Sequence, residues 1–173
     1  MVDQLRDWHD FYILIGTAAA TLVGLMFVAA SVGASYFTAE QEVQARSFLT
    51  PTVVHFSVVL LSCLAGMAPL LTATSLGALV ATGGAVGIGH SCRVALRLRR
   101  RGIFQRIDLA DRSCYILIPM AIYATFIATG VVLPTRPVLG LGMLAAALVA
   151  LLMLGIRNAW DMTVWIVLHT PNR

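Results

Sequence analysis

Five apolar runs, each close to 20 residues long, constrain the fold of this chain more than any other feature. A helical run of this length matches the thickness of the hydrocarbon core of a bilayer. Hydrophobic residues make up 59% of the 173 residues and charged residues only 12%, which leaves too little polar surface to cover a soluble domain of this size. We therefore expect an all-α fold, a polytopic integral membrane bundle formed by a single transmembrane domain over residues 1–173. The predicted spans cover residues 11–36, 53–71, 76–94, 114–133 and 138–156.

Prolines and small residues mark the boundaries of these spans. Pro51 is predicted to precede the second span as a proline of an early helical turn, where its missing N–H costs nothing. A few small residues at 72–75 are expected to join the second and third spans as a tight antiparallel hairpin. Residues 157–173 contain two tryptophans and are predicted to form an interfacial segment, because tryptophan favours the headgroup level. If residues 138–168 instead formed one straight helix of roughly 46 Å, one end would emerge from a core of about 30 Å or bend along its surface.

The positions of the arginines predict the orientation in the membrane. All 12 basic residues are arginines, and ten of them fall at or near one face of the predicted bundle. Six of the ten lie between residues 97 and 112, after the third span. By the positive-inside rule this loop is cytoplasmic, so we expect the N-terminus outside and the C-terminus in the cytoplasm. A topogenic and lipid-facing role explains the arginine run at 97–101, so no nucleic-acid partner is expected.

The first span, GTAAATLVGLMFVAAS over residues 16–31, carries more small and hydroxyl-bearing residues than lipid contact requires. At helical spacing these residues fall on one stripe, with carboxylates near both of its ends. The stripe and its extensions supply the candidate pore-lining residues Asp10, Thr17, Thr21, Gly24, Val28, Ser31, Ser35 and Glu42. A second row, Gly16, Ala20 and Gly24, has a small residue at every fourth position, while Ile15, Leu22 and Met26 on the far side suit lipid or bulky packing.

Two interpretations of this stripe remain open. Small residues and hydroxyls allow close helix packing in membranes, where hydroxyls also bond backbone carbonyls. Alternatively, copies of the helix surround an axis, and the stripe lines a path for inorganic cations. The second and third spans have polar faces of their own, and the fourth adds Tyr115 and Tyr123. Since closed rings are the common way for small membrane chains to build a path, our leading hypothesis is a homo-oligomeric cation channel lined by the first span.

His55 and His90 are the candidate gating or sensing residues. Each is predicted to lie one to two turns inside the cytoplasmic end of its span, so a hairpin would place them at similar depth. Ionisable groups inside a membrane are costly and often functional, although bonding to a carbonyl or a serine is the simpler interpretation. Without a third ligand or a supporting carboxylate, two histidines favour neither a metal nor a cofactor such as haem. The sequence also lacks HExxH, GxSxG and similar motifs, so we do not expect an enzyme.

The first-span stretch and the segment RNAWD, residues 157–161, resemble a set of small bacterial inner-membrane proteins of unknown function. Some members of that set are provisionally described as modulators of a membrane-bound protease. The resemblance implies a multi-pass protein of the bacterial inner membrane and a structural unit of Arg157, Asn158, Trp160 and Asp161, but it carries no chemistry. It also supplies the alternative hypothesis, a non-conducting adaptor that binds and regulates another membrane protein. A small-molecule carrier would require an inverted repeat, and five spans do not divide in that way.

Overall fold

The computed structural model describes residues 8–34, 39–100 and 113–169, and every regular element within these ranges is helical. In chain order the elements are α2 (His9–Ala34), α3 (Ala39–Met67), α4 (Ala73–Arg100), the π-helical turn η2 (Ser113–Leu117), α6 (Ile118–Val132) and α7 (Pro137–His169). Five stretches of these helices are long and apolar enough to cross a membrane. The predicted all-α class and the predicted number of spans are therefore confirmed.

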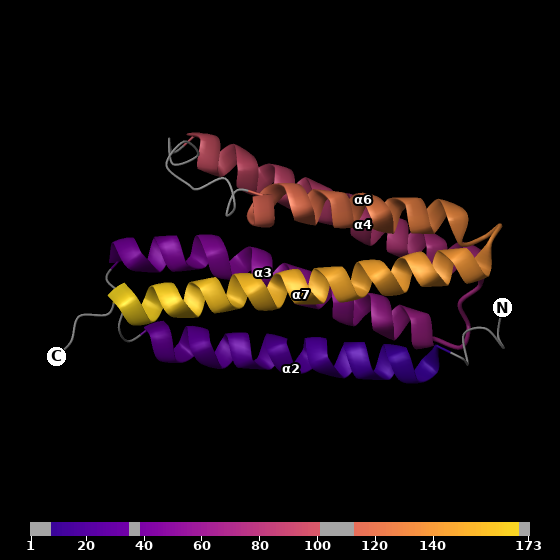
Figure 1. Cartoon of the computed structure of the whole chain (residues 1–173), viewed down its shortest axis with the longest axis horizontal. Coiled ribbons are helices and arrows are strands. Elements are labelled where there is room, and N and C mark those ends of the chain that lie inside the picture. Colours follow the sequence, from indigo (N-terminus) through magenta and orange to yellow (C-terminus); the bar gives the residue numbers. More distant parts are fainter. Residues whose placement is uncertain (1–7, 35–38, 101–112, 170–173) are drawn as a thin grey trace.

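The helices form one elongated bundle in which α7 packs against both α3 and α6 (Figure 1). The helix α2 lies at an edge of this bundle and packs mainly on α3, whereas α4 packs mainly on α6. Helices α2, α4 and α7 finish at the same end of the bundle, and α3 and α6 begin there (Figure 1). Because the last turn of α4 carries Arg97, Arg99 and Arg100, we call this the arginine-rich end.

Helix α7 supplies the centre of the core. Its leucines recur at alternating spacings of three and four residues, which places them on one helical face. The members of this face, each no more than 1% exposed, are Leu141, Leu144, Leu148 and Leu151. Among the candidate spans, α7 is the most deeply buried and α2 the least. The fifth span is therefore the central helix of the bundle, and the first span is peripheral.

The contact between α4 and α6 depends on glycine. A Cβ atom added to Gly77 would lie 2.7 Å from the carbonyl oxygen of Gly130, so the two backbones touch at this point. Gly84 lies in the same way against the carbonyl of Tyr123, at 2.7 Å, and Gly87 lies against the ring of that tyrosine. Close backbone approach through small residues is a common mode of helix association in membranes, because van der Waals packing replaces the hydrophobic effect there.

The connection between α3 and α4 is short, as predicted, but it comprises residues 68–72, because residues 73–75 already belong to α4. The start of α4 is capped. The side chains of Thr72 and Ser75 bond each other's backbone N–H groups, at 3.2 Å for Ser75 N to Thr72 Oγ1 and 2.8 Å for Thr72 N to Ser75 Oγ. This reciprocal arrangement resembles a capping box with serine in place of glutamate. Although the two helices are neighbours in sequence, α4 makes its larger contact with α6 rather than with α3.

The start of α3 differs from the prediction. The helix begins at Ala39, so Pro51 lies inside it rather than in its first turn. Residues 39–50 are rich in alanine, glutamate, glutamine and other good helix formers, which explains why helical structure extends far beyond the apolar stretch. The membrane-spanning part nevertheless starts at Thr50, next to the proline, so the predicted position of the apolar span is close to the observed one.

The segment predicted to be interfacial is a continuation of α7 as far as His169. At 33 residues the helix extends for about 50 Å, which is more than a hydrocarbon core of about 30 Å can hold. The pair Arg157 and Asp161, predicted from its spacing, forms with 3.3 Å between Nη2 and Oδ2. Residues 170–173 lie outside the described part of the chain, and an interfacial position for 157–169 stays a prediction.

Candidate functional site

The predicted stripe of α2 lies on the outer surface of the single chain. Six of its eight residues belong to the part of the structure whose side chains are described, and all six are exposed: Asp10, Thr17, Thr21, Gly24, Val28 and Ser31. A Cβ atom added to Gly24 would meet nothing within 4 Å. Ser35 lies outside the described residues, and the side chain of Glu42 is likewise outside them. The chain does not seal this stripe within its own core.

One hydroxyl of the stripe is bonded locally. Thr21 Oγ1 donates to the carbonyl oxygen of Thr17, one turn earlier, at 2.9 Å. Such bonding satisfies the hydroxyl without water and allows a threonine to face lipid or another helix. Thr82, exposed on α4, makes the same bond to the carbonyl of Ala78 at 2.8 Å. The two threonines are therefore chemically equivalent on two different helices.

The row of small residues on α2 does not form a single packing surface. Gly16 is buried against α3, where an added Cβ would lie 3.1 Å from the Cβ of Cys63, whereas Ala20 and Gly24 are exposed. The buried face of α2 is instead formed by Tyr12, Gly16, Ala19 and Met26. Ile15 and Leu22, predicted to suit lipid or bulky packing, are partly buried and pack against the core. The face of α2 that packs on the bundle thus combines small and large side chains, and large apolar side chains such as Leu14, Leu25 and Phe27 are exposed with the polar stripe.

The polar face of α3 points the other way. Its members recur at helical spacing and are buried within the chain: Thr52, His55, Val59, Ser62 and Gly66. Gly66 packs on the ring of Tyr12, because a Cβ atom added to Gly66 would lie 3.2 Å from the nearest ring carbon. The polar faces of the first three spans are therefore not gathered in one place, since α2 exposes its face and α3 buries its own.

The buried face of α3 contains the first of the two predicted sensing residues. His55 is 1% exposed, and its Nδ1 lies 2.7 Å from the hydroxyl oxygen of Tyr123 on α6, which is fully buried. This bond connects α3 to α6 across the middle of the bundle. The ring of Tyr123 is held in turn by Gly87, which leaves room for it on α4. Three helices thus meet around one histidine.

His90 lies one turn beyond Gly87 toward the arginine-rich end. It is close enough to His55 for the two rings to interact electrostatically, and it interacts in the same way with Arg93 and Arg97 on its own helix. The similar depth of the two histidines in the membrane stays a prediction. The Nε2 atoms of both His55 and His90 are buried and have no hydrogen-bond partner within the described residues.

Helix α7 adds an asparagine to this region. Asn158 is 1% exposed, and neither its Nδ2 nor its Oδ1 has a partner among the described residues. It follows Gly155 by one turn, and Gly155 packs on the ring of Phe56, the neighbour of His55. The helices α7 and α3 run in opposite directions (Figure 1), and the contact between Gly155 and Phe56 lies one turn from Asn158.

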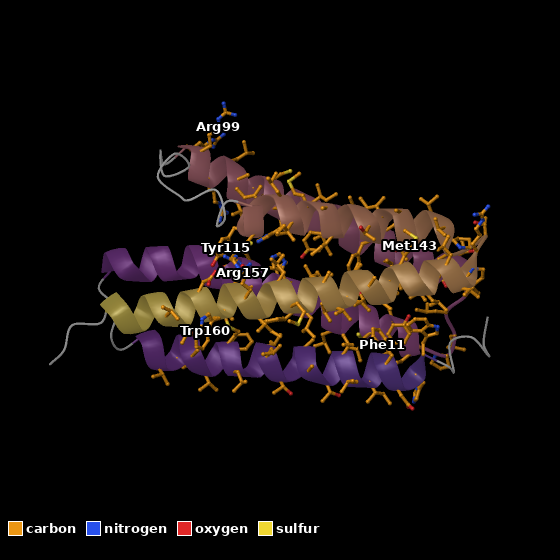
Figure 2. The ribbon with its side chains drawn as sticks, viewed as in Figure 1. Phe11, Arg99, Tyr115, Met143, Arg157 and Trp160 are labelled. Atoms are coloured by element: carbon orange, nitrogen blue, oxygen red, sulfur yellow. The ribbon has the colours of Figure 1, made fainter. Side chains whose placement is uncertain are left out.

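Arg157 and Tyr115 lie close to the same level. Figure 2 places Tyr115 of η2 and Arg157 of α7 near each other along the bundle, and η2 contacts both α4 and α7. Arg99, in contrast, points away from the bundle (Figure 2). We call His55, His90, Tyr123 and Asn158, together with the nearby Arg157, the internal polar cluster.

The sequence predicts only part of this cluster. The histidines stand out as ionisable residues inside apolar runs, whereas Tyr123 is only a polar exception in the fourth span. Asn158 was assigned to a unit with Arg157 and Asp161 without a position in the core. The signal that could have found it is simple: asparagine at helical spacing from small, buried neighbours inside an apolar helix is costly unless it faces polar groups.

The donor set does not match a metal site. Within the described ranges no group of three histidine, cysteine, aspartate or glutamate side chains comes together. The internal polar cluster combines histidine, amide, phenol and guanidinium groups, which form hydrogen bonds to polar ligands more readily than they form a coordination shell.

Comparison with known proteins gives no family for this chain. No family model, no curated protein and no solved structure matches it. The resemblance to bacterial inner-membrane proteins stays a prediction.

Proposed function

We propose that this chain is the subunit of a homo-oligomeric membrane pore that conducts cations and is lined by α2. The observation that carries the proposal is the outward position of the hydroxyl-bearing stripe of α2, which no other part of the described chain covers. Gly24 has open space on this face and permits close approach of another helix. An axis shared by several copies gives the stripe a polar environment that a single copy does not supply.

The charge of the stripe supports cations as the permeant species. Between Asp10 and Ser31 it has no charged residue, and Asp10 is exposed at the end opposite to the arginines. An acidic residue at a pore mouth concentrates cations, and hydroxyl or carbonyl oxygens replace their hydration water inside. The proposal keeps the predicted orientation with the N-terminus outside. Labelling of the Arg99→Cys variant by an impermeant thiol reagent on intact cells would contradict that orientation, because residue 99 would then lie outside the cell.

Potassium flux into liposomes containing the purified protein tests the proposal. Thr21→Val removes the hydroxyl from the stripe, and we expect it to reduce the flux at least about tenfold, since one lost polar contact in a pore costs roughly 1.4 kcal/mol or more. Thr82→Val is the matched control, because Thr82 makes the same i−4 bond on the exposed face of α4. Its flux should equal that of the wild type.

Three outcomes would reject the pore. One is the absence of flux above empty liposomes, and another is equal flux from the Thr21 and Thr82 variants. The third is a monomer that co-purifies with a larger membrane protein, which would favour the adaptor. The adaptor uses the same exposed stripe, but as a surface for a different partner.

A further inference from the structure

The outer face of α4 is separate from the stripe of α2, and the proposed pore does not use it. The members of this face recur at helical spacing: Thr82, Val86, Gly89, Arg93, Arg97 and Arg100. Gly89 is partly exposed and the other members are exposed. The face therefore changes along the helix, from small and apolar residues in the middle to three arginines at the arginine-rich end.

The three arginines form one positively charged strip. Residues three or four apart on a helix have Cβ atoms about 5–6 Å apart, so Arg97 is next to both Arg93 and Arg100. Between Arg93 and Arg100 the helix rises by about 10 Å. This length is of the same order as the thickness of the headgroup layer on one side of a bilayer, about 5–8 Å.

No acidic side chain among those that the structure describes neutralises this strip. Only two described side chains are acidic, Asp10 and Asp161. Asp10 lies in the first turn of α2, at the opposite end of the bundle, and Asp161 forms the ion pair with Arg157 on α7. The charge of the strip therefore favours an anionic partner from outside the described part of the chain.

The position of Arg93 in the membrane identifies the kind of anion. The candidate span of α4 ends at Arg97, so Arg93 lies one turn, about 6 Å, further inside it. An arginine at this depth is costly in hydrocarbon, but its long stem allows the guanidinium to reach the level of the headgroups. The anion that every bilayer supplies at this level is the phosphate of a phospholipid.

The apolar part of the face fits an acyl chain of the same lipid. A Cβ atom added to Gly89 would meet nothing within 4 Å, so the surface one turn from Arg93 is open. Val86, which is 62% exposed, continues this surface away from the arginines. Thr82 Oγ1 donates to the carbonyl oxygen of Ala78 at 2.8 Å, and this local bond makes its side chain compatible with lipid.

We propose that the outer face of α4 binds one anionic phospholipid of the leaflet at the arginine-rich end. Arg93 and Arg97 hold the phosphate, Arg100 adds positive charge beside the headgroup, and an acyl chain lies along Gly89 and Val86. A zwitterionic lipid has the same phosphate but also a cationic group, which the three arginines repel.

Titration of the purified full chain in detergent with single lipids, followed by native mass spectrometry, tests this proposal. Phosphatidylglycerol is the probe, and phosphatidylcholine with the same acyl chains is the zwitterionic comparison. We expect one phosphatidylglycerol per chain to bind at least about fivefold more tightly than phosphatidylcholine. Glycerol phosphate, which has the anion but no acyl chain, should not displace the lipid even in large excess.

The double variant Arg93→Gln with Arg97→Gln should weaken the binding of phosphatidylglycerol about 20-fold, because each basic residue near an anionic lipid contributes about fivefold. Arg97→Gln alone is the second variant, should the double variant fail to fold, and we expect about fivefold weaker binding. Arg99→Gln is the matched control, because it removes the same charge at the same end from a side chain that points away from the bundle (Figure 2). It should change the affinity by less than about twofold.

Gly89→Leu tests the acyl-chain part of the site without any change of charge. The leucine side chain would fill the open surface beside Arg93, so we expect weaker binding of phosphatidylglycerol.

The site is disproved if the two lipids bind equally, or if Arg99→Gln weakens binding as much as the double variant, which would indicate attraction to net charge alone. Displacement of the lipid by glycerol phosphate would indicate a site for a free anion and would also contradict the proposal. None of these results depends on ion flux, so the lipid site and the pore can fail independently.

Discussion

At the scale of single residues, two buried tyrosines of this chain have opposite surroundings. The hydroxyl of Tyr123 bonds His55, whereas the hydroxyl of Tyr12, in a side chain only 1% exposed, has no partner among the described residues. Both rings pack on a glycine, Gly87 and Gly66 respectively. The same chemical change at the two positions therefore separates the value of a hydrogen bond from the value of a buried ring.

Tyr123→Phe should destabilise the protein by about 1–3 kcal/mol, because it leaves His55 Nδ1 buried without a partner. Tyr12→Phe should cost less than about 0.5 kcal/mol or stabilise the fold, since it removes a hydroxyl that no hydrogen bond compensates. The measurement is the free energy of unfolding in mixed detergent micelles. Equal losses for the two variants would show that the His55 bond contributes nothing specific.

At the scale of helices, the pairing of α4 with α6 depends on the absence of side chains. Gly77 and Gly130 bring the two backbones into contact, and Gly84 and Gly87 continue the same face of α4. Gly83 and Gly89 lie on other faces of the same helix, where an added Cβ would meet nothing within 4 Å. One helix thus holds glycines that are required for contact and glycines that are not.

Gly77→Ala should destabilise the bundle by about 1–3 kcal/mol, because its Cβ would overlap the carbonyl of Gly130 and force the helices apart. Gly83→Ala should be neutral or stabilising by up to about 1 kcal/mol, the helix-propensity gain of alanine over glycine. Thermal unfolding of the two variants under identical conditions compares them. The account of this interface is wrong if Gly77→Ala is as stable as Gly83→Ala.

The sequence was sufficient to predict the elements but not the direction in which their faces point. Apolar length predicts the spans, because a bilayer imposes it, and the Arg157–Asp161 pair follows from a spacing of four. The stripes of α2 and α3 have similar hydroxyls and small residues, yet one is exposed and the other buried. Small polar side chains can lie on either a buried or an exposed helix face. Whether such a face is buried therefore depends on the packing of its neighbours, which the sequence of one helix does not show.

The predicted start of α3 was wrong for a different reason. Proline at position 51 suggested a helix start, but the helix formers at 39–50 extend the helix across it. The buried positions of Asn158 and Tyr123 were not predicted, because a single polar residue in an apolar helix forms no periodic pattern. Only the packed structure shows which groups such a residue faces.

At the scale of the whole molecule, the central helix and the peripheral helix of the bundle differ in burial. Helix α7 fills the centre with leucines, while α2 remains at the edge and is the least buried of the candidate spans. A peripheral helix with a hydroxyl-bearing outer face is suited to contact with further copies of the chain around an axis. The internal polar cluster lies on the other helices, α3, α4, α6 and α7.

Imaging of the detergent-solubilised particle by electron cryo-microscopy tests the central claim most directly. The account predicts a closed ring of identical subunits in which α2 is the innermost helix and Thr17, Thr21 and Gly24 face the axis. A solitary subunit, or a ring in which these residues face the surrounding detergent, would contradict it.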